Sequence, residues 1–508
     1  MTMKTINIIL FISLFLFFSG CADFDDLNTN PDVSTKGDAS MLLTGIELTF
    51  KPSNAKAFMW PFLFQKELIW TEGSISDYQY NKLPRVDYSV YDVLKNIKKM
   101  NEATETSGYT GDVYEAAGLF IHSYKLFNLS MQVGDIPFSE ANQGEAGVYQ
   151  PKYDAQKDVM IAILKDLDTA EDLFKNAINN KEVMSGDFFY NGNPSQWLKL
   201  VNSFKLYVLI SLSKKENDND LNLVNKFVAV VNDPVKHPIM TSNDDNFQIV
   251  YRDKQGEKKP FYATGFEAYA IASSFVVDKF KNLKDRRLFY YADPLKGKPE
   301  HDFNSYAGLD PSAPNEINLF ESASGNASMI NKLYYSQDYP QGFPYVILGF
   351  DDVQFIIAEA AARGWIPNTE KYYKNGIRSS MEFRMHHIDP KYAHGMELTE
   401  SYISSYLEKP EVQLPADKEG KIRQIMWQKF LGSLLQNDMN VFFDYRRTGY
   451  PEFPINPATN KNEVSTKMPL RWLYPDLEYN YNQENIHSAV NSQFGGSDDA
   501  NQLIWVLK

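Results

Sequence analysis

The sequence predicts a mainly α-helical fold in which paired helices carry an irregular, loop-rich lobe. Apolar residues recur at three- and four-residue steps in several separate segments, which is the period of a helix with one buried face. Breaker residues end several of these segments. The long stretches between them are rich in turn-forming and aromatic residues and have weak periodicity. Helices therefore supply the expected scaffold, and the intervening stretches supply the expected lobe.

The first clear helix ends at residues 134–137, which read Gly-Asp-Ile-Pro. Glycine and proline disfavour continuation of a helix at this point. The apolar face before this breaker is formed by Val113, Ala117, Phe120, Tyr124, Phe127 and Met131.

Two further helices are predicted, each with its own start signal. One begins near Asp154, a favourable N-cap residue, and the other begins at Asn193, which is followed by Pro194 in the first turn. The first aligns Met160, Ile163, Leu167, Ala170 and Phe174, and the second aligns Trp197, Val201, Phe204, Val208 and Leu212.

A helical hairpin is predicted over about residues 350–387. One helix stops at Gly364, a new one starts near Thr369 and runs through Ser380, and the short link between them is typical of an αα-hairpin. The hairpin has the length and the alternation of small and aromatic residues of a tetratricopeptide-like unit. The stripe of the first helix is Val353, Ile356, Ile357, Ala360 and Ala361.

A later helix is predicted from about Lys421 to Gln436, with Ile422, Ile425, Met426, Phe430 and Leu434 facing inward. Four long stretches lack such a pattern: residues 52–92, 233–265, 291–348 and 451–500. Long ordered loops on a helical scaffold usually carry function. We therefore expect the binding site in these stretches.

The first 21 residues predict export and lipid attachment. Lys4 precedes an apolar run from Ile6 to Phe18, and Ser-Gly-Cys follows at 19–21. This order is typical of a signal peptide, residues 1–20, that is cleaved before a lipidated Cys21. The run is short for the roughly 20 residues of a transmembrane helix. Membrane attachment is therefore expected through the lipid anchor only.

Residues 21–37 are expected to form the lipidated cysteine and a flexible tether, because they are acidic and turn-rich. Acidic residues just after the cysteine resemble a signal that sends some Gram-negative lipoproteins to the cell surface, and an ordinary periplasmic tether is the alternative. Residues 38–508 are then expected to form a single ligand-binding domain made of the helical scaffold and the loop-rich lobe.

Composition limits the partners and the chemistry. The net charge is −14, which disfavours binding to nucleic acid. Cys21 is the only cysteine, so neither an intrachain disulfide nor a cysteine zinc site is expected. His386, His387 and His394 form the one histidine cluster, and neighbouring helical residues point about 100° apart, so a solvated helix end explains them better than a metal site. No metal and no cofactor are expected.

No common catalytic motif is present in the sequence. G-x-S-x-G, H-E-x-x-H, the phosphate-binding loop and G-x-G-x-x-G are all absent. We therefore expect a binding protein without enzymatic activity. A secreted glycoside hydrolase with a pair of carboxylates remains the alternative from another class. An adaptor built only of tetratricopeptide-like helices is a third possibility, which the long aromatic loops disfavour.

Several ordered motifs point to one family. They are DLNTNPD at 26–32, GDIPFSEA at 134–141 with PKYD at 151–154, GD at 186–187 before WLKLVNSFKL at 197–206, DRR at 285–287, AEA at 358–360, GIRSSM at 376–381, QK at 428–429, YRRTGYP at 445–451 and RWLYP at 471–475. Together these motifs resemble the SusD/RagB family of outer-membrane nutrient-binding lipoproteins. Arg286 departs from the pattern, since the family commonly has proline there, and this leaves the local turn open.

The resemblance implies a fold of four packed tetratricopeptide-like helical pairs with an irregular second lobe. It also implies a partner, a SusC-like TonB-dependent transporter barrel that the lipoprotein caps while it holds an oligosaccharide or, in some relatives, a peptide. Most of the shared motifs are better explained as scaffold. Arg446 and Arg447 are expected to cap carbonyls or to pair with a carboxylate such as Asp444.

Candidate ligand-binding residues lie in the first loop-rich stretch. Trp60, Trp70, Tyr78 and Tyr80 are interleaved with polar residues, namely Gln65, Glu67, Glu72, Ser74, Ser76 and Asp77. Aromatic faces suit sugar rings, and neighbouring polar groups can bind their hydroxyls. Tyr78 and Tyr80 point the same way if this stretch is extended. The loop with Tyr334, Tyr335, Tyr339 and Tyr345 is expected to form the opposing wall. The alternative is that Trp60 and Trp70 complete the core.

Overall fold

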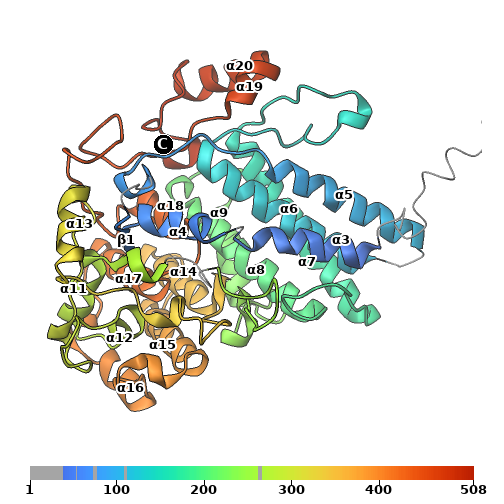
Figure 1. Cartoon of the computed structure of the whole chain (residues 1–508). Helices are drawn as coiled ribbons and strands as arrows, with labels where there is room; N and C mark the ends of the chain where they lie inside the picture. The colour runs from blue at the N-terminus through green and yellow to red at the C-terminus, as the bar shows by residue number, and fades with distance from the viewer. Residues whose placement is uncertain (1–37, 53, 73–76, 108–110, 261–265) are drawn as a thin grey trace, which may run out of the picture.

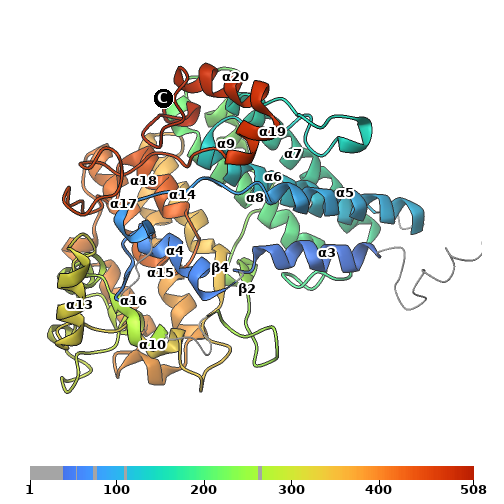
Figure 2. The same cartoon turned by 45° about the horizontal axis from the view of Figure 1, so that its top comes forward.

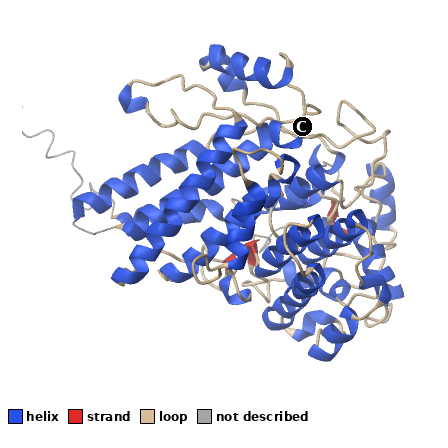
Figure 3. Ribbon diagram, turned by 180° about the vertical axis from the view of Figure 1, so that it is seen from behind, coloured by secondary structure: helices blue, strands red, loops and turns tan. Residues whose placement is uncertain are grey.

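The computed structural model describes residues 38–52, 54–72, 77–107, 111–260 and 266–508. Helices and the loops between them make up most of this part of the chain (Figures 1 and 3). The expected signal peptide, Cys21, the tether, Ser74 and Ser76 lie outside the described residues.

The N-terminal half is a layer of long helices that lie side by side (Figures 1 and 2). Neighbours in this layer are also close in sequence, as expected for antiparallel helical pairs. The helices are α3 (Ala39–Glu47), α5 (Val90–Ser107), α6 (Asp112–Val133), α7 (Gln156–Asn180), α8 (Pro194–Ser211) and α9 (Leu223–Asn232).

The C-terminal half is built around α14 (Phe350–Arg363), α15 (Thr369–His387), α17 (Lys418–Gly432) and α18 (Asn440–Thr448). α14 packs on both α15 and α17, and it also contacts α8 of the other half. α19 (Asp476–Tyr481) and α20 (Gln483–Phe494) lie beside the loop that follows α6 (Figures 1 and 2), where Gln150 donates to the carbonyl of Tyr481.

Shorter elements form the loop-rich lobe beside the C-terminal helices. They are α4 (Ala55–Phe64), α10 (Phe266–Tyr269), α11 (Ser274–Leu283), α12 (Arg287–Tyr291), α13 (Asn315–Ala323) and α16 (Glu400–Leu407). Two antiparallel strand pairs are found in the described residues: β1 (Leu68–Trp70) with β3 (Ala270–Ala272), and β2 (Phe247–Ile249) with β4 (Tyr345–Leu348).

The predicted apolar stripes form the core. Every residue of the five stripes is buried except Tyr124, which is half-buried. The predicted hairpin is confirmed, with Gly364 in the left-handed conformation (φ 90°) between α14 and α15. The mainly α fold is thus confirmed, because helical periodicity reports burial of one face directly.

Two predicted helix boundaries are wrong. α7 begins at Gln156, and Asp154 does not cap it; the Asp154 carboxylate instead accepts from the N–H groups of Phe138 and Ser139, at 3.1 and 2.7 Å. The helix predicted to reach Gln436 ends at Gly432. Leu434 is still buried, but from the turn after the helix.

The stretches predicted to lack helices contain several. α4 lies within 52–92, α13 within 291–348, and α19 and α20 within 451–500. The sequence did not predict α4, because nearly all of its own residues are apolar and Pro61 lies inside it. No apolar stripe with a helical period can therefore be distinguished from a polar face. Hydrophobic periodicity identifies a helix that has one apolar face and one polar face. It does not identify a helix that is apolar on nearly every side.

The shared motif residues Asp187 and Trp197 act together as scaffold. The Asp187 carboxylate accepts from three backbone N–H groups of the turn before α8, and it also accepts from Trp197 Nε1 at 3.0 Å. The buried indole ring thereby fixes this turn against the helical layer.

The arginine pair of the 445–451 motif is also structural, as predicted. Arg446 donates to the carbonyls of Met131 and Leu470, both at 2.7 Å. Arg447 lies between the carboxylates of Glu359 and Asp444. Both guanidinium groups are buried and bonded within the protein, so neither is available to bind a ligand.

The turn at Arg286 forms although arginine stands where the family commonly has proline. Asp285 accepts from the N–H of Arg287 at 2.9 Å, which starts α12. The N–H of Arg286 donates to the hydroxyl of Tyr402 at 2.9 Å. Proline has no N–H group, so arginine here adds a hydrogen bond that proline could not make.

Candidate ligand-binding site

A buried polar turn after α4 positions the predicted site. Gln65 Oε1 accepts from the N–H of Phe442 at 2.8 Å, and Glu67 Oε2 accepts from the N–H of Leu435 at 2.6 Å. Lys66 Nζ donates to the carbonyl of Gln79 at 2.6 Å, and burial lowers the pKa of this amine to about 7. This turn therefore ties α4 both to the turn before α18 and to the segment that carries Tyr78.

Trp60 and Tyr78 form the first aromatic pair. Their rings are nearly parallel, with centroids 5.6 Å apart and an interplanar angle of 16°. Trp60 is 39% exposed, and Tyr78 is half-buried and packs edge-on against Phe64. Burial raises the pKa of Tyr78 to about 12, so its hydroxyl stays protonated at neutral pH. The indole of Trp60 is therefore partly exposed to solvent while it stacks on a half-buried ring.

Trp70 and Tyr335 belong to a second aromatic cluster. Pairing of β1 with β3 places Trp70 opposite Ala270, and its ring centroid lies 5.4 Å from that of Tyr269 and 6.0 Å from that of Phe266. Phe266 in turn lies 5.8 Å from Tyr335. The half-buried indole of Trp70 donates to Glu72 Oε2 at 3.0 Å, so a carboxylate borders this cluster.

Tyr80 is placed differently from the prediction. Residues 77–80 form the 3-10 helix η2 (Asp77–Tyr80) and not an extended strand, so Tyr78 and Tyr80 do not point the same way. Tyr80 is 4% exposed, and its hydroxyl donates to the carbonyl of Ala313 at 2.8 Å. Its ring fills the lobe and offers no open face.

The predicted opposing wall is only partly formed. Tyr334 is 7% exposed, and with Tyr345 of β4 it lines a small cavity of about 20 Å³, which is too small for a sugar ring. Tyr335 faces Phe266, as described above, and Tyr339 packs on Tyr392. Four candidate residues keep part of their side chain accessible to solvent: Trp60 is exposed, and Trp70, Tyr78 and Tyr335 are half-buried.

Sequence reasoning missed Phe266 and Tyr269. The two aromatic residues are spaced three apart and directly follow the stretch 233–265 that was predicted to be a loop. This spacing was a signal for a short helix with one aromatic face. Their contact with Trp70 depends on the β1–β3 pairing, which joins segments about 200 residues apart and which no local pattern predicts.

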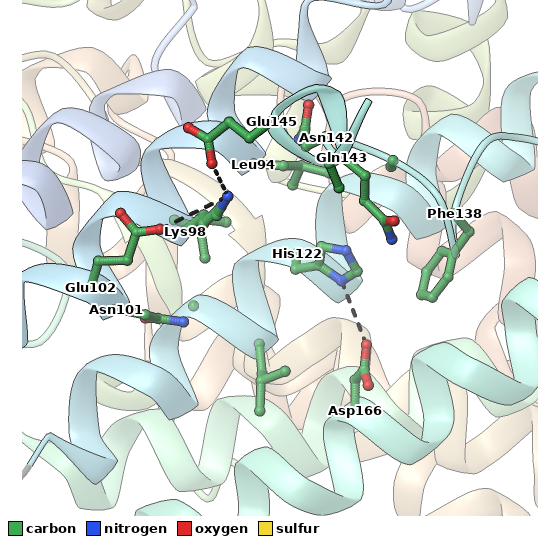
Figure 4. A pocket seen from close by; sticks show the side chains of 15 residues that line it. Leu94, Lys98, Asn101, Glu102, His122, Phe138, Asn142, Gln143, Glu145 and Asp166 are labelled. Carbon is green, nitrogen blue, oxygen red and sulfur yellow. Dashed lines mark hydrogen bonds and ion pairs between the residues drawn. The ribbon is translucent and has the colours of Figure 1, made fainter. Parts of the chain in front are cut away.

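A groove of about 750 Å³ lies elsewhere, between α5, α6 and the loop after α6 (Figure 4). Lys98 of α5 faces Glu102 and Glu145, and His122 faces Asp166, with 3.5 Å between Nδ1 and Oδ2. Its charged groups thus largely pair with one another. The ion pair to Glu145 holds the loop against α5, so we interpret these residues as scaffold.

Across the described ranges, no three His, Cys, Asp or Glu side chains gather as they would around a metal ion. In the same part of the chain, none of the helices combines the length and apolarity needed to cross a bilayer. His387 bonds to the carbonyl of Phe383 and His394 to Asp293, so the histidine cluster does not converge.

The architecture is an all-α scaffold of packed helical pairs that carries a lobe with partly exposed aromatic rings. A family model, SusD-like_2, described as "Starch-binding associating with outer membrane", matches residues 33–475. The chain therefore belongs to the SusD-like family of outer-membrane nutrient-binding proteins.

Solved structures agree with this family. A SusD homologue from Bacteroides fragilis is 41% identical, with 93% of this chain and 100% of that chain covered and a TM-score of 0.87. A second homologue from the same organism is 34% identical, with the same coverage and a TM-score of 0.82. A chitin-binding SusD homologue from Flavobacterium johnsoniae, at 18% identity, 92% and 98% coverage and a TM-score of 0.72, shows the same fold. Among curated protein sequences no match was found.

Proposed function

We propose that this protein is a lipid-anchored outer-membrane protein that binds an oligosaccharide nutrient and delivers it to a SusC-like TonB-dependent transporter. The observation that carries the proposal is the partial exposure of Trp60 and Trp70 on a SusD-like fold, each backed by a second ring. The role is one of capture and transfer and needs no bond chemistry.

The chemistry of the two aromatic groups suits a carbohydrate. Sugar rings have apolar faces that stack on indole and phenol rings, while their hydroxyls need polar partners. Glu72 accepts from Trp70 Nε1 and still has acceptor capacity. Asp77, paired with Lys461 at 2.7 Å, lies next to Tyr78. These carboxylates can accept hydrogen bonds from sugar hydroxyls beside the stacked ring.

The anchor and the partner rest on other support. Cys21 ends an apolar export segment, and the family description places relatives at the outer membrane. A binding protein held by lipid at the outer membrane needs a transporter to move its ligand inward. We therefore propose that the acyl chains on Cys21 hold the protein beside a TonB-dependent barrel at the cell surface.

The ligand is tested by calorimetric titration of the protein with maltooligosaccharides and chitooligosaccharides. Replacement of a stacking aromatic by alanine, in Trp60→Ala or Trp70→Ala, should weaken binding by about 1–3 kcal/mol, by analogy with base stacking on aromatic rings. Tyr481→Ala removes another exposed ring, 72% exposed, far along the chain, and serves as the matched control. Equal affinity in all four proteins, or no binding to any glycan of a broad array, would overturn the proposal.

The partner is tested by affinity capture of the tagged protein from gently solubilised outer membranes. A barrel protein should be recovered in a near-equal amount. Recovery of this protein alone in several detergents contradicts the delivery role but leaves the glycan-binding role intact, because the titration is made without the barrel.

A further inference from the structure

Gln79 lies between the two aromatic groups of the proposed ligand surface. It belongs to η2, and its side chain is fully buried. Its neighbour Tyr78 stacks on Trp60 in the first aromatic pair. Its side-chain Oε1 accepts a hydrogen bond from the backbone N–H of Trp70 at 2.8 Å, and the ring of Trp70 belongs to the second aromatic cluster. One residue thus joins the segment that carries Tyr78 to the strand that carries Trp70.

This hydrogen bond is made at the edge of β1 that faces away from β3. Within the described residues β1 and β3 form a sheet of two strands, so every second N–H of β1 points away from its partner strand. The N–H of Thr71 donates to the carbonyl of Tyr269 at 3.0 Å, and the N–H of the preceding residue, Trp70, therefore lies on the opposite edge. Gln79 satisfies that N–H from η2. The placement of Trp70 thus depends on η2 as well as on β3.

η2 is itself held firmly, so it can serve as a fixed support. The hydroxyl of Tyr80 donates to the carbonyl of Ala313 at 2.8 Å, and the carbonyl of Tyr80 accepts from the N–H of Lys461 at 2.8 Å. Lys66 Nζ donates to the carbonyl of Gln79 at 2.6 Å. A buried amide is costly unless it is hydrogen-bonded, and both acceptor oxygens of Gln79 are used by segments that carry the proposed ligand surface.

We infer that Gln79 is a positioning residue of the ligand site. It holds Trp70 in a fixed place relative to the stacked rings of Trp60 and Tyr78, so that one oligosaccharide chain of several sugar units contacts both aromatic groups. Because Gln79 is buried, it acts through Trp70 and does not touch the sugar. The second ring contact is then made at a lower entropic cost, since the two groups are already placed. The inference rests on the proposed binding of an oligosaccharide.

The inference is tested by calorimetric titration of the mature chain with maltose, maltohexaose, N,N′-diacetylchitobiose and hexa-N-acetylchitohexaose. If one chain contacts both aromatic groups, a hexasaccharide should bind at least about tenfold more tightly than its disaccharide. Gln79→Met removes the acceptor for the N–H of Trp70. It should reduce this gain to below about threefold, while the affinity for the disaccharide changes by less than about twofold.

A double-mutant cycle separates positioning from a general loss of structure. In the Trp70→Ala background, Gln79→Met should not weaken hexasaccharide binding further, because the ring that it positions is absent. Gln156→Met is the matched control. Gln156 is also fully buried, and its amide donates to the carbonyl of Ser130 at 2.8 Å and accepts from the N–H of Val506 at 3.1 Å. Because these bonds lie in the helical layer, this variant should leave the affinity for the hexasaccharide unchanged.

Gln79→Asn is a second variant, which keeps an amide but draws its oxygen back from Trp70. The melting temperature of each variant shows whether it is folded. An unchanged gain for the hexasaccharide in a folded Gln79 variant, or equal weakening with and without the ring of Trp70, would overturn the inference and leave the glycan-binding role intact. The inference also fails if neither hexasaccharide binds to the unmodified protein, and the broad glycan array then decides separately on the proposed function.

Discussion

The helical scaffold and the surface proposed to bind the ligand differ in how far their polar groups are paired within the protein. In the scaffold, Arg447 lies between Glu359 and Asp444, and Asp187 accepts hydrogen bonds from a whole turn and from Trp197. At the surface of the lobe, the rings of Trp60 and Trp70 stay partly exposed, and the carboxylates of Glu72 and Asp77 beside them are not buried. The contrast separates residues that maintain the fold from residues that are available to a ligand.

The same contrast explains the family motifs. The conspicuous charged and aromatic residues of those motifs, such as Arg446, Arg447 and Trp197, are mostly buried and satisfied. The partly exposed rings of Trp60 and Trp70 lie outside those motifs. A motif shared across the family therefore identifies the scaffold, and the ligand has to be sought elsewhere.

The largest effect on stability is expected from breaking the buried charge network. Burial alone would raise the pKa of Glu359, but Arg447 and Arg363 outweigh it and lower that pKa to about 2. Arg447→Met removes the guanidinium that joins two buried carboxylates and leaves Glu359 with Arg363 alone and Asp444 with Lys429 alone. The free energy of unfolding should therefore fall by about 3–5 kcal/mol. Urea denaturation measures it. Arg423→Met, which removes an exposed pair with Glu452, is the control and should cost less than about 1 kcal/mol.

A smaller, pH-dependent effect is expected at Glu47 of α3. Burial, with the nearby charge of Asp187, raises the pKa of Glu47 from 4.5 to about 10. The folded protein therefore holds a proton that the unfolded chain releases above pH 4.5, so this contribution to stability is complete below pH 4.5 and is lost as the pH rises toward 10. Glu47→Gln is neutral throughout and can keep the bond from the N–H of Phe188.

We expect Glu47→Gln to stabilise the protein by about 2 kcal/mol near neutral pH and to flatten the pH dependence of its unfolding. Thermal melts at several pH values between 5 and about 9 test this. Glu115→Gln, at an exposed position of α6, is the matched control. If the two variants show the same pH profile, Glu47 is not the buried acid described above.

A still smaller effect on stability is expected at the proposed ligand surface. Trp60→Ala should change the free energy of unfolding by less than about 1 kcal/mol, because its ring is already partly in water. Trp197→Ala, at a fully buried ring, should cost about 3–5 kcal/mol and serves as the comparison. Similar losses for the two tryptophans would show that Trp60 belongs to the core.

No measurable effect on stability is expected from Cys21→Ala. The change should instead release the protein into the soluble fraction, since it removes the proposed acylation site and with it the firm part of membrane binding. Membrane fractionation in cells that lack the transporter partner measures this directly. Quantitative sedimentation of the variant with the membranes would contradict the lipoprotein assignment.

The sequence by itself determined the helical scaffold and the family. One-sided helices such as α6 and α8 show their buried face in the spacing of residues like Phe120 and Phe204, because neighbours on a helix face are only three or four positions apart. The order of the motifs identified the family. These signals are local, so they can be seen without knowing what packs against them.

Only the tertiary structure decided which side chains meet. Tyr80 turns inward because residues 77–80 form a short 3-10 helix, while Tyr78 stacks on Trp60. Trp70 meets Tyr269 through the pairing of β1 with β3, although about 200 positions separate the two residues. Such contacts depend on strand register and on the packing of helices that are distant in sequence. A sequence pattern with a period of two or 3.6 residues reports neither of these.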